Sequence, residues 1–177
     1  MSGADDRSDV VLHALRRTRQ VRRFTAEPVA EADLHAILEA ARWTGSSENR
    51  QTWLFVVIRD AAARQRIGEL SRYARHVGRA PIAIAIAMPG EDVETDAYDE
   101  GRAAERILIA AGALDLGAGI GWTEPSERDE VGALLGISPP AFVRTIIAVG
   151  HPTADARRPR SGPGTGRKAL AEVVRER

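Results

Sequence analysis

The chain has 177 residues with 25 basic and 25 acidic side chains, so its formal net charge is zero and no overall field favours nucleic acid or an anionic membrane as a partner. It contains no cysteine, which excludes disulfides, thiolate nucleophiles and cysteine-based zinc sites. This length fits a single domain over residues 1–177.

The N-terminal segment lacks the basic and apolar regions of a signal peptide, and no apolar run reaches the ~18 residues of a membrane span. We therefore expect a cytoplasmic protein with no membrane partner, in which residues 1–9 are a flexible lead-in.

Two amphipathic helices are predicted at residues 10–17 and 31–42, because apolar side chains recur at helical spacing in both segments. Pro28 prevents one continuous helix, so residues 19–28 should form an extended or turning connection.

Three strands are predicted from runs of β-branched residues, at residues 54–58, in the alternating stretch PIAIAIAMP around Ile84, and at residues 143–150. Helices and strands interleave, but two helices precede the first strand, so a run of βαβ units is not expected. A mixed sheet flanked by helices is expected instead.

A central helix is predicted over residues 99–116, where small residues would allow close helix contact. A further helix is predicted from Ser126 to Gly136, with Asp129 as a capping-box partner. Residues 153–166 are rich in Gly, Pro and Arg, which predicts an exposed arm or loop.

Arginine is concentrated around the end of the first predicted helix, at Arg16, Arg17, Arg19, Arg22 and Arg23. Guanidinium groups match phosphate oxygens, so the cluster is a candidate anion site. The alternative is that the first two stabilise the helix C-terminus and the others are solvated. The later pair, Arg167 and Lys168, has the same two interpretations.

The segment LGAGIGWTEP, residues 116–125, is not a dinucleotide fingerprint, because its glycines follow a predicted helix instead of linking a strand to a helix. Gly117 would end that helix in a tight turn, or the small residues would let the backbone approach a flat ligand. Both interpretations stay open. Trp122 beside the glycines is a candidate for stacking on a substrate.

Two other chemistries find no support in the sequence. The four histidines are scattered without the spacing of metal ligands, so no metal site is expected. No serine lies in a G-x-S-x-G motif, so acyl-enzyme hydrolysis is not expected either.

A polar loop, GSSENRQ at residues 45–51, runs directly into the predicted strand at 54–58. Many hydrogen-bonding side chains beside a buried strand suggest that a polar ligand lies there.

Taken in order, these segments resemble the FMN-dependent nitroreductase family. TRQVRRF resembles the family's R-x-S-x-R-x-F segment, GSSENRQTW resembles its P-S-S-x-N-x-Q-P-W loop, and GAGIGW resembles the turn after its central helix. IIAVGHP and GRKALAEVV are similar to its closing strand and its C-terminal phosphate contact. The resemblance extends from about Leu12 to Val174.

The resemblance implies the fold class α+β, with a mixed, mainly antiparallel sheet flanked by helices. It also implies an intertwined homodimer with one FMN in each of two sites at the subunit interface. By position, the phosphate and the polar ring edge would be bound by Arg19, Gln20 and Arg22. The ribityl and flavin groups would be held, often from the opposite subunit, by Ser46, Ser47, Asn49 and Gln51. Thr123 and Glu124 would lie near the reactive ring edge, and Arg167 and Lys168 at the phosphate.

The sequence also departs from the family pattern. Gln20 stands where serine is usual, Thr18 replaces an arginine found in many members, and Gly45 and Thr52 replace the two prolines of the loop. The segment between Met88 and the predicted central helix is short, which leaves little chain for a lid over the substrate.

The first functional hypothesis is an FMN oxidoreductase that takes hydride from NAD(P)H and reduces a nitroaromatic, quinone or similar acceptor by a ping-pong mechanism. No catalytic side chain is assigned, because the flavin supplies the chemistry. One alternative is a non-catalytic protein of the same fold that binds a flavin or a deazaflavin. Another is a colourless interaction module that uses the arm at residues 153–166.

Overall fold

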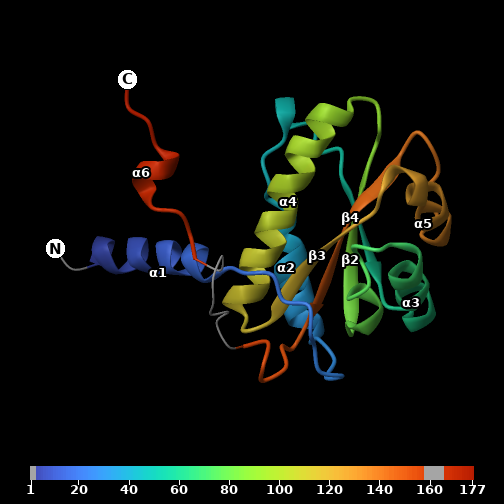
Figure 1. Cartoon of the computed structure of the whole chain (residues 1–177), viewed down its shortest axis with the longest axis horizontal. Helices are drawn as coiled ribbons and strands as arrows, with labels where there is room; N and C mark the ends of the chain where they lie inside the picture. The colour runs from blue at the N-terminus through green and yellow to red at the C-terminus, as the bar shows by residue number, and fades with distance from the viewer. Residues whose placement is uncertain (1–2, 158–165) are drawn as a thin grey trace.

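A computed structural model describes residues 3–157 and 166–177 and shows a four-stranded sheet between two layers of helices (Figure 1). The strands are β1 (Leu54–Ile58), β2 (Ile82–Met88), β3 (Gly117–Trp122) and β4 (Phe142–Gly150). The helices are α1 (Gly3–Arg17), α2 (Glu31–Arg42), α3 (Ala61–Leu70), α4 (Val93–Ala113), α5 (Arg128–Leu134) and α6 (Leu170–Val173). Short 3-10 turns are η1 (Ser47–Asn49), η2 (Val77–Arg79) and η3 (Pro125–Glu127).

The sheet has the strand order β1-β2-β4-β3, and all three neighbouring pairs are antiparallel. In the described part of the chain, the one parallel pairing is an isolated bridge between Gln20 and Ala118. The α+β class predicted from the sequence is confirmed, and the sheet proper is antiparallel throughout instead of mixed.

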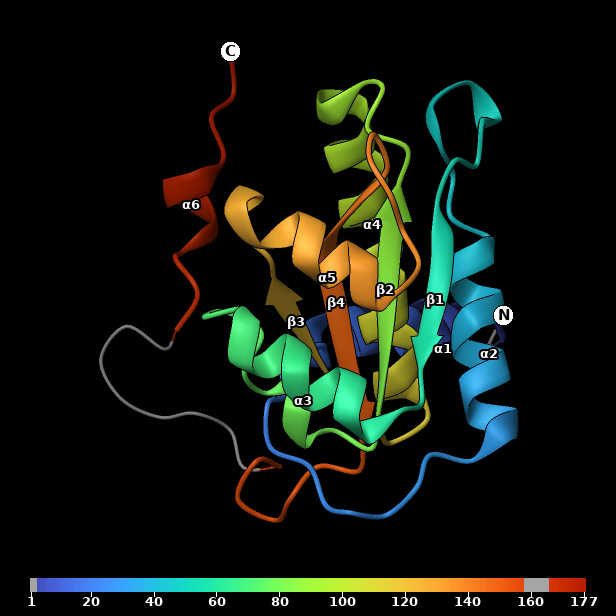
Figure 2. The same ribbon diagram turned by 90° about the vertical axis from the view of Figure 1, so that its right-hand side faces the viewer.

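Strand β2 is buried along its whole length because helices cover both faces of the sheet (Figure 2). Its isoleucines at 82, 84 and 86 belong to the core shared with α2 and α4, whereas its alanines at 83, 85 and 87 belong to the core shared with α3 and α5. Successive strand residues point to opposite faces, so the alternation of large and small residues sorts them between the two layers.

The predicted strands and the helix at residues 31–42 are confirmed. The first helix begins at Gly3, so residues 3–9 are helical, while residues 1–2 lie outside the described chain. That residues 1–9 are flexible stays a prediction. The central helix begins at Val93 because Asp92 caps it by accepting a hydrogen bond from the Thr95 backbone N–H. Only residues 89–92 therefore link β2 to α4, which is even less chain for a lid than expected.

Helix α3 was not predicted from the sequence. Its short span carries several polar residues, so its apolar periodicity is weak. Asp60 starts the helix by accepting hydrogen bonds from the backbone N–H groups of Ala62 and Ala63. This capping aspartate was the signal that could have located it.

Two interpretations of the glycine segment were left open, and one of them, a helix end with a turn at Gly117, is wrong because the segment forms β3. The left-handed residue that ends α4 is Asp115, with φ of 57°. A Cβ at Gly119 would lie 2.1 Å from the Val21 carbonyl oxygen, and one at Gly121 would lie 2.9 Å from the Ala74 Cβ. These glycines therefore admit neighbouring segments of this chain to the strand.

The helix predicted from Ser126 is α5, and its cap was misplaced. The turn η3 precedes the helix, and the capping box joins Glu124 and Glu127 instead of Ser126 and Asp129. Gly136 lies just past the helix with a positive φ of 70°, as its predicted role at the helix end requires.

Both ends of the chain project from the body of the molecule (Figure 1). Large apolar side chains are exposed on these ends at Val10, Val11, Leu12, Leu15, Leu170, Val173 and Val174. Of the arm predicted at residues 153–166, residues 158–165 lie outside the described chain. Within the described ranges, no helix combines the length and apolarity needed to cross a membrane.

Candidate functional site

A cavity of about 690 Å³ opens beside β3 at the edge of the sheet. It is lined by Arg22, Arg72, Tyr73, Arg75, His76, Arg79, Ile120 and Trp122, and we call it the arginine pocket. Its size falls in the range of sites that bind small molecules or cofactors.

Arg22 reaches this pocket because residues 20–22 run alongside β3. The Val21 backbone N–H donates to the Ala118 carbonyl oxygen at 2.8 Å, and the Ile120 N–H donates to Gln20 Oε1 at 2.6 Å. The side-chain oxygen of Gln20 is therefore already used within the protein, and the Gln20 amide NH₂ is the part left for a ligand.

The opposite wall is the loop at residues 71–79, which follows α3. His76 is buried in it and its Nε2–H donates to the Gly119 carbonyl oxygen at 3.1 Å, so this hydrogen bond joins the loop to β3. Burial lowers the pKa of His76, and the nearby Arg22 guanidinium lowers it further, against the opposing effect of the Gly119 hydrogen bond. His76 is therefore neutral near pH 7 and adds a hydrogen bond instead of a charge.

The four arginines of the pocket are exposed, and no acidic side chain lines it. In the part of the chain that the structure describes, none of the four forms an ion pair. Arg72 lies over the Tyr73 ring, 5.6 Å from its centroid. The pocket therefore combines unpaired positive charge with the flat surfaces of Tyr73 and Trp122.

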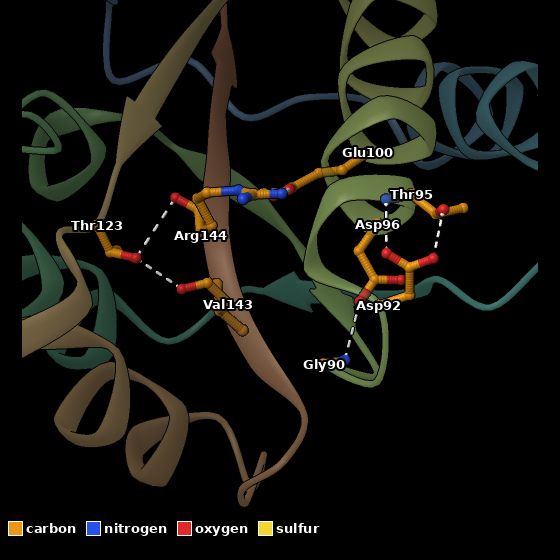
Figure 3. Close-up of polar contacts among 8 residues, drawn as sticks. All are labelled: Gly90, Asp92, Thr95, Asp96, Glu100, Thr123, Val143 and Arg144. Atoms are coloured by element: carbon orange, nitrogen blue, oxygen red, sulfur yellow. Dashed lines mark hydrogen bonds and ion pairs between the residues drawn. The ribbon is translucent and has the colours of Figure 1, made fainter.

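Trp122 is 43% exposed, and it rests on a buried ion pair. Arg144 Cζ lies 5.4 Å from the Trp122 ring centroid, and the guanidinium is directed toward Glu100 (Figure 3). Arg144 Nε donates to Glu100 Oε2 at 2.7 Å, and Nη2 donates to the same oxygen. This pair fixes the cation beneath the tryptophan.

Glu100 and Arg144 are only 2% and 6% exposed. Glu100 Oε1 is buried without a hydrogen-bond partner among the described residues. Burial raises the pKa of the Glu100 carboxyl, although Arg144 opposes that shift. The pair is thus a structural element of the fold with one oxygen left unsatisfied.

Thr123 and Glu124 follow Trp122 at the end of β3. The Thr123 hydroxyl is buried and donates to the Val143 carbonyl oxygen at 2.6 Å (Figure 3). The Thr123 backbone N–H donates to the Arg144 carbonyl oxygen at 2.9 Å. The Thr123 side chain therefore anchors the segment to β4. Glu124 is exposed and is not among the residues that line the pocket, and its backbone N–H donates to the Glu127 carboxylate at 2.9 Å.

Arg19 does not share the pocket of Arg22. It borders a second cavity of about 370 Å³ between α1, α4 and Pro152, together with Arg17 and Arg157. The Arg19 guanidinium donates to the Arg157 carbonyl oxygen. Residues 20 and 21, which lie against β3, separate the two arginines. The structure therefore divides the predicted basic cluster: Arg17 and Arg19 line one cavity and Arg22 the other. Arg16 lines neither cavity, and Arg23 pairs with Asp155.

The polar loop lies at the other edge of the sheet, before β1. Three strand spacings, roughly 14 Å, separate the edge strands β1 and β3. Asp99 on α4 holds this loop by accepting a hydrogen bond from the Ser47 N–H at 2.9 Å, and Ser46 Oγ accepts one from the Gln51 N–H at 2.9 Å. Within one chain, the loop and the arginine pocket are therefore not brought together.

The loop holds its shape at a conformational cost. Left-handed φ angles of 51°, 56° and 50° occur at Glu48, Asn49 and Gln51. Such angles are uncommon outside glycine and cluster at ligand-binding sites. The Asn49 and Gln51 side chains are exposed, and Gln51 Nε2 donates to Asn49 Oδ1 at 3.3 Å, so the two amide groups lie together at the surface of the loop.

Arg167 and Lys168 are exposed ahead of α6, and neither lines one of the two cavities. The sequence analysis also missed the basic stretch RYARHVGR at residues 72–79, which supplies five of the eight residues of the arginine pocket. Three arginines and a histidine around Tyr73, in a stretch with no predicted element, were the signal that could have found it.

Comparisons with known proteins agree on one family. A model of the Nitroreductase family matches residues 15–74. A solved structure from Desulfovibrio desulfuricans, assigned as a nitroreductase and in complex with FMN, is 30% identical with a TM-score of 0.77, over 94% of this chain and 96% of that one. An NADH dehydrogenase of Thermus thermophilus is 27% identical over 83% of this chain and 88% of its own length. An FMN reductase [NAD(P)H] of Bacillus subtilis is 25% identical over 85% of this chain and 69% of its own length.

Proposed function

Because this chain belongs to the nitroreductase family, we propose that it is an FMN-dependent NAD(P)H oxidoreductase that reduces a nitroaromatic, quinone or similar acceptor by a ping-pong mechanism. When bound, FMN would accept hydride from NAD(P)H and pass reducing equivalents to the acceptor at the same site. We further propose that the protein works in the cytoplasm, where NAD(P)H is supplied, and forms one domain per chain.

The proposal depends on one observation: the residues that could bind FMN form two incomplete sets, which lie at opposite edges of the sheet. The arginine pocket offers cations and flat walls at the β3 edge, and the polar loop offers outward amides at the β1 edge. A homodimer in which the loop of one copy covers the pocket of the other would join them. The exposed apolar side chains of α1 and α6 supply surface for such an association.

The residues present fit FMN chemically. Its phosphate requires cations, and its ring requires a flat apolar surface with a few polar contacts. We assign Arg19, Gln20, Arg167 and Lys168 to the phosphate side. Arg22 and the backbone at Thr123 and Glu124 are assigned to the ring side, with Ser46, Ser47, Asn49 and Gln51 contributed by the second copy.

The protein's own residues bind and orient, and no side chain is required as acid or base for the hydride step. Trp122 is proposed to stack on the substrate, because it is exposed in the pocket and supported from beneath by Arg144. With only residues 89–92 between β2 and α4, this chain has no lid there, which favours an open substrate site.

The first test is the absorption spectrum of the purified protein after FMN addition and desalting, followed by anaerobic NADH and NADPH. We expect a retained band near about 450 nm, typical of oxidised flavin, that bleaches with a nucleotide. A retained band that resists both nucleotides would favour a non-catalytic or deazaflavin-linked protein. A colourless protein would contradict the cofactor.

Subunit mixing tests the shared site. Arg22→Ala damages the pocket half and Gln51→Ala damages the loop half, so each variant alone should bind FMN poorly. In a mixed dimer one site receives both defects and the other receives none. Unfolding and refolding the two variants together in equal amounts makes about half of the dimers mixed, so recovery of about a quarter of the wild-type flavin content would support the proposal. No recovery in a sample shown to contain mixed dimers would contradict it.

A further inference from the structure

The two cavities carry more positive charge than one FMN can use. The smaller cavity is lined by Arg17, Arg19 and Arg157 against one carboxylate, Asp115, and the arginine pocket has four arginines and no carboxylate. FMN has one phosphate group, which carries about −2 charge. Because the two clusters lie on different sides of residues 20 and 21, this single phosphate can occupy only one of them.

In the proposed function, Arg22 contacts the FMN ring and the smaller cavity holds the FMN phosphate. Arg72, Arg75 and Arg79 on the opposite wall are then left without a role. They lie within eight consecutive residues, are exposed, and have no acidic neighbour lining the pocket. Like charges held close together repel, and a bound anion relieves that repulsion.

We propose that Arg72, Arg75 and Arg79 form a binding site for an anionic group, phosphate or carboxylate, on the substrate that enters the arginine pocket. This inference rests on the proposed function and names the substrate class of the same site. The substrate combines a flat ring, which would contact Trp122 and Tyr73, with an anion for the guanidinium groups.

Two substrates have this chemistry. If the ligand is the electron donor, the anionic group is the 2′-phosphate that distinguishes NADPH from NADH. If the ligand is the electron acceptor, the anionic group is a carboxylate on its aromatic ring. Guanidinium groups bind either anion through paired N–H donors, so the shared site chemistry does not depend on which one is used.

The experiment compares Arg72→Gln and Arg75→Gln with Arg59→Gln. Arg59 is exposed, lies after β1 at the other edge of the sheet, and pairs with Glu31, so its substitution is a matched loss of one surface charge. Values of kcat/KM are measured for NADPH against NADH, and for 4-nitrobenzoate against its neutral analogue 4-nitrobenzamide.

For the wild type we expect one anionic substrate to be preferred over its partner by about tenfold, the effect of a charge-assisted hydrogen bond. Each pocket variant should lose most of that preference, and Arg59→Gln should keep it. If the variants lose the preference for NADPH over NADH, the bound anion is the 2′-phosphate. If they lose the preference for 4-nitrobenzoate over 4-nitrobenzamide, it is the carboxylate. Unchanged ratios in both pairs would overturn the proposal, as would a fall in FMN content with unchanged ratios, because the arginines would then serve the cofactor.

A binding measurement separates this proposal from the proposed function. Flavin-free protein is titrated with inorganic phosphate and with benzoate while the fluorescence of Trp122 is followed, with Trp122→Phe identifying its share of the signal. Saturable binding that Arg72→Gln and Arg75→Gln weaken about tenfold supports the anion site even if no flavin binds. Binding that is absent, or equal in these variants and Arg59→Gln, overturns it even if the flavin enzyme is active.

Discussion

Arginine is used in two opposite ways on the two sides of Trp122. Arg144 next to the ring is buried and has a fixed partner in Glu100. Arg72 and Arg75, which line the same pocket as Trp122, are exposed and have no carboxylate partner in the described chain. A buried charge must be paired for the protein to fold. An exposed cation stays hydrated without a protein partner, so it is available to bind an anionic ligand. Arginine therefore stabilises the fold in one region and is available for binding in the other.

Substitutions in these two regions should therefore have different effects. Changes at the buried pair should alter the free energy of unfolding, and changes in the arginine pocket should alter binding while leaving the fold intact. The glycines of β3 and His76 join the two regions, so changes there should affect both.

The largest effect is expected from Glu100→Ala, which leaves the Arg144 guanidinium buried without its partner. The free energy of unfolding should fall by about 3–5 kcal/mol, measured by urea denaturation. The control is the double variant Glu100→Leu with Arg144→Met, which replaces the pair by apolar groups and should recover most of the loss. A single variant as stable as wild type would show that the pair is not a structural requirement.

Gly119→Ala should have the next largest effect, because its Cβ would lie 2.1 Å from the Val21 carbonyl oxygen. Displacing residues 20–22 should cost about 1–3 kcal/mol of stability and also lower the flavin content, since Arg22 moves with them. The matched control is Gly101→Ala, because nothing lies within 4 Å of its added Cβ, and it should stabilise α4 by about 0.5–1 kcal/mol. Equal effects of the two substitutions would contradict the close packing at β3.

A smaller, pH-dependent effect is expected at His76. Its pKa is lowered in the folded protein from the ordinary value of 6.5, so the unfolded chain binds a proton more readily. The stability due to neutral His76 is therefore complete above about pH 6.5 and is lost as the pH falls from there through the lower folded-state pKa. His76→Gln keeps a donor for Gly119 but does not titrate, so the difference in unfolding free energy between variant and wild type should change between about pH 7.5 and pH 5.5. A pH-independent difference would contradict this assignment.

The smallest effect on stability is expected from Arg75→Gln, within about 0.5 kcal/mol of wild type, because the side chain is exposed and unpaired. Its effect should appear on ligand addition instead. Phosphate should raise the Tm of the wild type through binding to the folded state, and raise that of the variant less. Equal shifts in wild type and Arg75→Gln would place the bound phosphate elsewhere.

Local patterns in the sequence identified most of the fold. The alternation around Ile84 predicted β2, and the spacing of Leu34 and Ile37 predicted α2, because side-chain periodicity reports which face of an element is buried. Gly117 misled because a glycine after a helix is typical of a helix end, whereas here the small residues admit Val21 and Ala74 to a strand. A contact between segments that are distant in the sequence produces no periodic pattern of side chains, so periodicity could not predict it.

The sequence alone determined most of the elements, but not α3 or β3, together with the absence of cysteine chemistry and the ordered motifs that resemble one family. The tertiary structure alone decided that Arg19 and Arg22 lie in different cavities, that Arg22 meets residues 72–79 at β3, and that the polar loop lies at the opposite edge. The physical reason is that helix and strand preferences act over a few residues, whereas the strand order brings together segments about fifty to a hundred residues apart through packing that no single segment encodes.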